Sequence, residues 1–168
     1  MTKVALNSKD RQYWLLKSEP DSFSFDDLWN LPGRTTGWDG VRNYQARNYM
    51  RDEMKKGDLA FFYHSGADPG IVGVVEIVRE GYPDQTAVDP KDPHYDPKTK
   101  GGESAWSMVD IRAIERLSRP VTLAEMRTRP ELAALPLLQK GNRLSVQKVG
   151  APEWNAILAL AKRGEPDS

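Results

Sequence analysis

The stretch Tyr13–Pro20, YWLLKSEP, joins a short apolar segment to three polar residues and a proline. Tyr13–Lys17 has the pattern of a buried strand, and Pro20 prevents the chain from simply continuing it. Two later stretches have the same character: GVRNYQARN at Gly40–Asn48 and FYHS at Phe62–Ser65. Recognition of a flat heterocycle requires aromatic walls for stacking and polar groups for its edge, and these stretches contain both.

The composition fits one globular domain with a highly charged surface. The chain has 168 residues, of which 39% are hydrophobic and 29% are charged, enough for a sizeable core. Its 24 basic and 24 acidic residues cancel. A net charge of zero argues against strong, non-specific binding to a phosphate backbone, although it does not exclude a local basic face.

Several classes of chemistry have no support in the sequence. The chain has no cysteine, and its two histidines offer no recognisable metal set, so we expect no metal and no cofactor. Walker A, GxSxG, GxGxxG and HExxH strings are absent, and we predict that the protein is not an enzyme. No apolar run approaches the roughly 20 residues of a membrane span. We expect a cytoplasmic protein (nuclear if the organism is eukaryotic) that does not bind membranes and is a monomer.

Short strand patterns alternate with short helix patterns along the chain. Strands are predicted at Tyr13–Lys17, Leu59–His64, Ile71–Val78, Trp106–Glu115 and Leu144–Val149. Helices are predicted after the caps Ser24 and Thr122, over Asn43–Met54, and from Pro152 onward. Gly73 within a strand indicates a bulge or a close backbone approach. This order predicts an α+β domain built on a small mixed or closed sheet, over residues 13–162, with flexible ends at 1–12 and 163–168.

The segment Tyr82–Gly102 breaks this pattern. It is rich in Pro, Asp, Lys and Gly and has few apolar residues that could anchor it. Its four prolines deny it a regular hydrogen-bond ladder. We predict a mobile flap on the ligand side of the domain, with its Lys-rich end toward the ligand. The alternative is an inert insertion.

The three stretches quoted first, in this order and spacing, resemble the EVE domain family, as does RLSV at Arg143–Val146. The resemblance runs from about Tyr13 to Ala161. It implies a PUA-like pseudo-barrel of five to six mixed strands with surrounding short helices. It also implies a non-enzymatic module that binds a modified nucleobase, modified cytosine in DNA, in an aromatic pocket. A base in duplex DNA must be flipped out of the stack before a pocket can enclose it.

Two other functions fit the same residues. An RNA or tRNA reader avoids much of the flipping cost when its base is already unpaired. A small-molecule enzyme or a protein-interaction module could use the same cleft. A salt titration separates these, because phosphate contacts make affinity fall as salt rises.

The site residues follow from the quoted stretches and the resemblance. The predicted base pocket consists of Lys17, Ser18, Glu19, Trp38, Gly40, Val41, Asn43, Tyr63, His64, Ser65, Trp106 and Ser145. The predicted phosphate contacts are Arg42, Arg47, Arg51 and Arg143. In particular, we expect Trp38 and Trp106 to line one cleft with Ser18 and Ser65.

Each assignment has a plain structural alternative. KSEP can be a capped surface turn, both tryptophans can pack in the core, and the basic helix face can simply be solvated. His64 and Ser145 can be structural hydrogen bonders. Gly66 occupies a place where many EVE sequences carry a polar side chain, so no side-chain contact is expected there.

Overall fold

The computed structural model describes residues 11–99, 104–142 and 144–163. Arg143, residues 100–102 of the predicted flap, and the terminal segments 1–10 and 164–168 lie outside the described residues.

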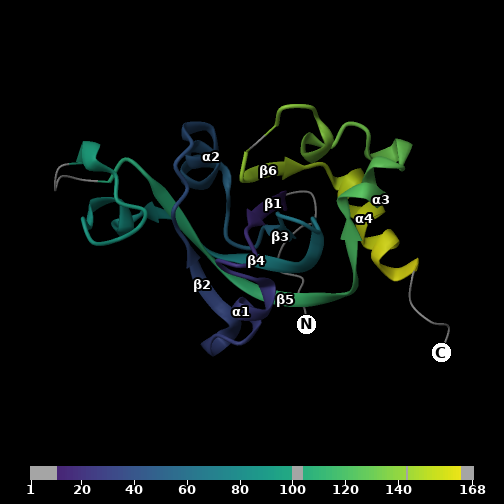
Figure 1. The fold of residues 1–168 in the computed structure, drawn as a ribbon, viewed down its shortest axis with the longest axis horizontal. Helices are drawn as coiled ribbons and strands as arrows, with labels where there is room; N and C mark the ends of the chain where they lie inside the picture. The colour runs from purple at the N-terminus through teal and green to yellow at the C-terminus, as the bar shows by residue number, and fades with distance from the viewer. Residues whose placement is uncertain (1–10, 100–103, 143, 164–168) are drawn as a thin grey trace.

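Across the described residues, six strands form one mixed sheet in the order β2-β5-β4-β3-β1-β6 (Figure 1). The strands are β1 Tyr13–Ser18, β2 Thr35–Trp38, β3 Leu59–His64, β4 Gly70–Pro83, β5 Ser107–Thr122 and β6 Val146–Val149. β1 pairs with β3 in parallel, and the other neighbours are antiparallel. The sheet is open, with β2 and β6 as its edges. The α+β class with six mixed strands is confirmed, although sequence analysis missed β2.

Short helices surround the sheet, and their predicted caps are confirmed. The α-helices are α1 Phe25–Trp29, α2 Tyr44–Asn48, α3 Leu123–Arg127 and α4 Ala151–Arg163. Single turns are η2 Pro32–Arg34, η3 Tyr49–Glu53, η4 Gln85–Val88, η5 Pro97–Thr99, η6 Pro130–Leu132 and η7 Pro136–Leu138. Ser24 caps α1, accepting from the Asp27 N–H at 3.0 Å, and Thr122 caps α3. Asn43 caps α2, which runs directly into the π-helical turn η3.

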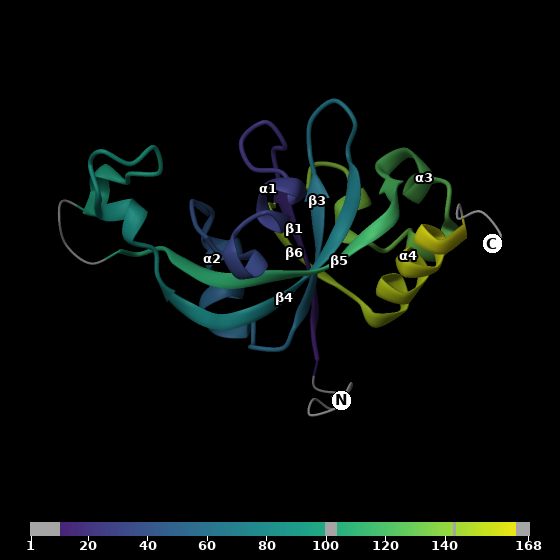
Figure 2. The same cartoon turned by 90° about the horizontal axis from the view of Figure 1, so that it is seen from below.

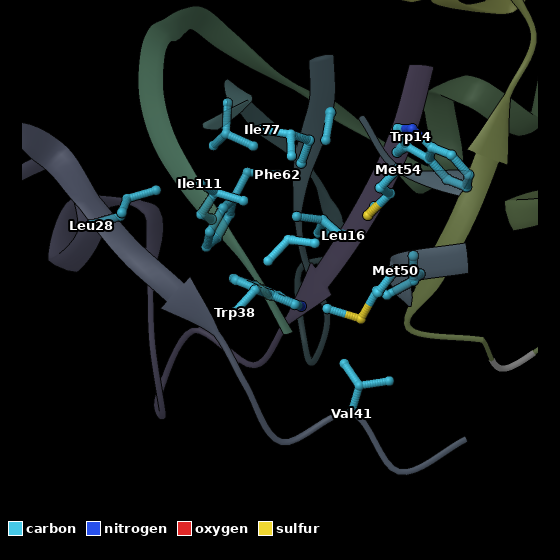
Figure 3. Packing of buried hydrophobic residues seen from close by; sticks show 14 of the residues in the cluster. Trp14, Leu16, Leu28, Trp38, Val41, Met50, Met54, Phe62, Ile77 and Ile111 are labelled. Carbon is cyan, nitrogen blue, oxygen red and sulfur yellow. The ribbon is translucent and has the colours of Figure 1, made fainter. Parts of the chain in front are cut away.

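Two hydrophobic cores lie on opposite faces of the central strands. Trp14 and Leu16 of β1 join Phe62 of β3 in the first core, on the side of α1 and α2 (Figure 3). The intervening Leu15 joins Phe61 in the second core, with α3 and α4. Figure 2 shows these two pairs of helices on either side of the central strands. Because both faces of β1 and β3 are buried, their sequences are nearly continuous apolar runs.

The long hairpin of β4 and β5 curves across the sheet, and residues 84–99, which follow β4, lie far from α3 and α4 (Figure 1). Its curvature goes with several shifts of register, one of them between Ile71 and Gly73. A Cβ placed on Gly73 would lie 2.3 Å from the Phe25 ring. The register shift confirms the first of the two predicted alternatives, a bulge, and the space beside Gly73 is filled by the Phe25 side chain.

The described part of the predicted flap buries little apolar surface, as expected, and polar contacts that the sequence analysis did not foresee hold it in place. Asp84 is fully buried, and Asp96 accepts a hydrogen bond from Trp106 Nε1 at 2.7 Å. Asp84, Asp89, Asp92 and Asp96 each accept from the backbone N–H two residues onward. These contacts form Asx turns, which organise a segment that buries little apolar surface.

Candidate functional site

A cavity of about 420 Å³ opens at the ends of β1 and β2. Two stretches of the chain and two separate residues line it: Lys17, Ser18, Glu19, Ser22 and Phe23; Thr36, Gly37, Trp38, Asp39, Gly40, Val41 and Arg42; and His94 and Ser145. The first two groups include the predicted KSEP and WDGVR walls, which the fold brings face to face.

Trp38 forms an aromatic wall of this cavity and packs on the first core. It ends β2, paired with Val109 of β5, and it is 8% exposed. Its ring meets Phe62 edge-on at 5.6 Å and Phe23 at 6.5 Å between centroids. Figure 3 shows the indole beside the C-terminal end of β1, next to Leu16. Packing against the first core thus fixes the Trp38 indole that lines the cavity.

Lys17 and Asp39 place opposite charges in the cavity without pairing. Among the described residues, neither group forms a salt bridge or a hydrogen bond with another side chain, and the Asp39 carboxylate accepts only from its own backbone N–H. Burial lowers the pKa of Lys17. Burial also raises the pKa of Asp39, and the negative charge of Asp84 adds to that rise. Both groups are therefore partly desolvated and are available to a ligand.

The KSEP segment forms a turn that also lines the cavity. The Ser18 hydroxyl donates to the Phe23 carbonyl, and the Glu19 carbonyl accepts from the N–H groups of Ser22 and Phe23. The Ser18 hydroxyl proton is thus used within the chain, although its oxygen can still accept a bond. The turn of the structural interpretation is therefore confirmed, and its contact with a ligand stays a prediction.

Arg42 lines the cavity, but its guanidinium is occupied within the chain. It donates to Asp84 at 3.0 Å and to the carbonyl oxygens of Val41 and His94. A further bond to Thr86 Oγ1 uses the last of its five N–H groups. The phosphate contact predicted for Arg42 therefore has no free donor in this conformation. Its observed role is to tie the cavity wall to the segment after β4.

Several predicted pocket residues lie elsewhere. Asn43 accepts from the Ala46 N–H as the cap of α2, and it does not line the cavity. Tyr63 is 4% exposed in the second core, on the face of β3 away from Trp38. His64 Nε2 accepts from the Phe25 N–H at 3.0 Å, which holds the start of α1. These three side chains therefore have structural contacts: a helix cap, a core position and a hydrogen bond to the first turn of α1.

The prediction that one cleft contains Trp38, Trp106, Ser18 and Ser65 is wrong. Trp38 and Ser18 share the cavity, whereas Ser65 lines a neighbouring cavity that includes Glu19. Trp106 lines a third cavity. Its indole is fixed there by Asp96, which belongs to the segment between β4 and β5.

Two of the three described arginines predicted to contact phosphate lie over one pair of stacked rings: Arg42 over Trp106 and Arg47 over Tyr44. Arg47 lies over the Tyr44 ring and donates to the Ala105 carbonyl at 2.7 Å. Arg51 pairs with Asp52 at 2.8 Å, where both side chains are about half exposed. Neither lines the Trp38 cavity. The structure does not bring Arg42, Arg47 and Arg51 together as one phosphate cluster.

Sequence analysis missed two residues that matter for the chemistry of the cavity. Asp39 stands between Trp38 and Gly40, so its place in the WDGVR wall was a usable signal. His94 is 52 residues from Arg42 along the chain, and only the folded hairpin brings it to the cavity. No local pattern could have assigned His94.

Within the described ranges, no group of His, Cys, Asp and Glu residues could hold a metal ion. No helix in those ranges is both long and apolar enough to cross a membrane.

The EVE domain family model matches residues 12–160. The chain belongs to the EVE domain family. This EVE domain is 44% identical to rat thymocyte nuclear protein 1 over 92% of its own length and 75% of that protein. A solved Pseudomonas syringae structure is 49% identical with a TM-score of 0.83, covering 89% of this chain and 99% of that one.

A crystal structure of human THYN1 protein was solved in complex with 5-methylcytosine-containing DNA. That protein is 42% identical to this EVE domain, with a TM-score of 0.85. The match covers 92% of this chain and 99% of the human chain.

Proposed function

We propose that this EVE domain is a non-enzymatic reader of modified cytosine in DNA and that it binds the base in the Trp38 cavity. The observation that carries the proposal is the combination of an aromatic wall with two unpaired charges, Lys17 and Asp39, in one cavity. A volume of about 420 Å³ suits an enclosed small heterocycle. The human relative crystallised with 5-methylcytosine-containing DNA supports the choice of ligand.

The two charges match the edge of cytosine. Its exocyclic amino group donates hydrogen bonds, and carboxylates are the usual acceptors for it in proteins. Asp39 would accept from this group, and the Lys17 ammonium would donate to a ring acceptor. Trp38 would contact the ring of the base and its methyl substituent. Because the cavity is partly desolvated, each of these contacts is stronger than it would be in water.

Entry of the base sets the preferred form of the DNA. A paired base must be flipped out at a cost of a few kcal/mol, whereas a single-stranded base avoids most of that cost. Single-stranded DNA should therefore bind more tightly than a duplex that carries the same modified base.

Asp39→Asn tests the role of the carboxylate. The substitution removes the charge and replaces one acceptor oxygen with a donor, so affinity for a 5-methylcytosine oligonucleotide should fall about 10-fold or more. Fluorescence anisotropy against modified and unmodified strands measures this loss. Asp68→Asn, in the exposed turn after β3, is the matched control and should bind like wild type. Equal binding by Asp39→Asn and wild type would refute the assignment.

The pH dependence gives a second test. The ionised form of Asp39 accepts from the base, and its pKa is raised by burial and by Asp84. Affinity should therefore weaken as pH falls, starting above the value of about 4 at which an ordinary aspartate titrates. Asp39→Asn should remove this component.

A matching RNA strand in the same assay measures preference for DNA over RNA.

A further inference from the structure

Tyr44 presents an aromatic ring to solvent beside the Trp38 cavity. It is the first residue of α2 and is 56% exposed. Among the described residues, the exposed large hydrophobic side chains are Tyr44 and Ile114, of which Ile114 is 42% exposed. Tyr44 is stacked on the buried Trp106, with ring centroids 4.7 Å apart and planes 25° apart. The Trp106 indole donates a hydrogen bond to Asp96, which positions the ring on which Tyr44 stacks, and the two rings form an aromatic wall.

This stack forms one side of a second cavity, of about 380 Å³. Pro93, Tyr95 and Pro97 line the cavity with Lys98. Arg42 and His94 line both this cavity and the Trp38 cavity. The two cavities are thus separated by these shared side chains. Consecutive nucleotides of one strand could occupy them together.

Positive charge exceeds negative charge around the stack, which favours a phosphate-bearing ligand. Arg42 and Lys98 line the cavity with one carboxylate, Asp96, and Arg47 adds a further positive charge over the Tyr44 ring. The Arg47 guanidinium lies 4.9 Å from the Tyr44 ring centre, and its hydrogen bonds go to Ala105 O and Asn48 Oδ1. No carboxylate within the described ranges forms a salt bridge with it. Because the charges of the whole chain cancel, electrostatic attraction to a nucleic acid must come from local positive groups. An arginine beside an exposed aromatic ring is a combination that binds stacked nucleotides.

We propose that the Tyr44–Trp106 stack and the second cavity form a subsite for a nucleotide adjacent to the modified one on the same strand. The neighbouring base packs against the aromatic wall, and Arg47 contacts its phosphate. This subsite rests on the proposed function of the Trp38 cavity. It adds affinity for any sequence, because every base has a face that can stack.

The experiment varies both partners of the contact. Wild type, Tyr44→Ala and Tyr44→Phe are titrated with a labelled single strand that carries one 5-methylcytosine. A second strand has abasic sites on both sides of that base. Tyr44→Ala should lose about 5-fold or more in affinity for the intact strand and nothing for the abasic strand. Tyr44→Phe should bind like wild type, as should Ile114→Ala, the matched exposed residue on β5.

Loss of the flanking bases should also weaken wild type about 5-fold or more, a measurement that depends on no variant. The proposal is overturned if Tyr44→Ala binds the intact strand normally or loses equally on both strands. It is also overturned if wild type binds the two strands alike. Tyr44→Ala should keep the wild-type ratio of modified to unmodified affinity. Failure of the proposed function would appear separately, as a wild type with no preference for 5-methylcytosine over cytosine.

Discussion

Replacing Asp84 with alanine should destabilise the domain more than the loss of an exposed ion pair would. The carboxylate is fully buried at the end of the β4 strand. It accepts from the Gly40 N–H at 2.8 Å, from Arg42 at 3.0 Å, and from the Thr86 N–H and hydroxyl at 2.9 and 2.5 Å. It therefore joins the cavity wall to the segment between β4 and β5.

The magnitude follows from what the substitution leaves behind. Removing one partner of a buried ion pair costs about 3–5 kcal/mol, largely because the other charge stays buried. The Arg42 side chain is 24% exposed and keeps its bonds to the His94 carbonyl, so water and backbone relieve part of that cost. We expect a loss of about 2–3 kcal/mol in the free energy of unfolding. Asp84→Asn keeps one acceptor oxygen and should lose less.

Urea unfolding at pH 7 measures this loss, with Asp52→Ala as the control. Asp52 forms an exposed pair with Arg51 and should show no measurable change. Burial alone would raise the pKa of Asp84, but hydrogen bonds from Thr86, Gly40 and Arg42 outweigh burial and lower it. The stabilisation is therefore complete above about pH 4 and disappears as pH falls through the lowered pKa. A loss below about 0.5 kcal/mol for Asp84→Ala at pH 7 would refute this reasoning.

Two further predictions concern the first core and its edge. Gly73→Ala should cost about 1–3 kcal/mol in urea unfolding, because the new methyl group would overlap the buried Phe25 ring; a wild-type midpoint would show that the ring shifts freely. His64 accepts from the Phe25 N–H, and burial lowers its pKa. The neutral His64 side chain should stabilise the domain above about pH 6.5, and this contribution should weaken at lower pH. His64→Gln should therefore reduce the difference in urea midpoint between pH 7.5 and pH 5. An unchanged difference would contradict this.

The central sheet could be predicted because burial on both faces leaves a strong local signal. Tyr13–Ser18 and Leu59–His64 are nearly continuous apolar runs, and both form the strands expected of them. β2 leaves no such signal, since Thr35–Trp38 is short, contains glycine and gains its stability from pairing with β5. Its existence depends on a partner more than 70 residues away in sequence, which no local pattern specifies.

Part of the wall of the Trp38 cavity could also be predicted, because some of its residues stand at strand ends that have a local sequence signal. Lys17 and Trp38 each stand at a strand end next to polar residues, and both line the cavity. Strand alternation already placed Tyr63 and His64 on opposite faces of β3, so the inclusion of both in one pocket conflicted with the pattern. The grouping of Trp106 with Trp38 failed because it depended on the path of the intervening hairpin. Distance in space, unlike alternation, is not a local property of the sequence.

The segment after β4 contains a repeated Asp-Pro pattern that its overall composition does not reveal. Three Asp-Pro pairs begin at Asp89, Asp92 and Asp96, and each aspartate accepts from the N–H of the residue after the proline. Proline removes one N–H and fixes its own φ angle, so it favours the Asx turn that this bond closes. The prolines exclude a regular hydrogen-bond ladder, as predicted, and they are also part of three consecutive turns. These turns present the His94 carbonyl to Arg42, and in this way a polar, proline-rich segment completes the wall of the cavity.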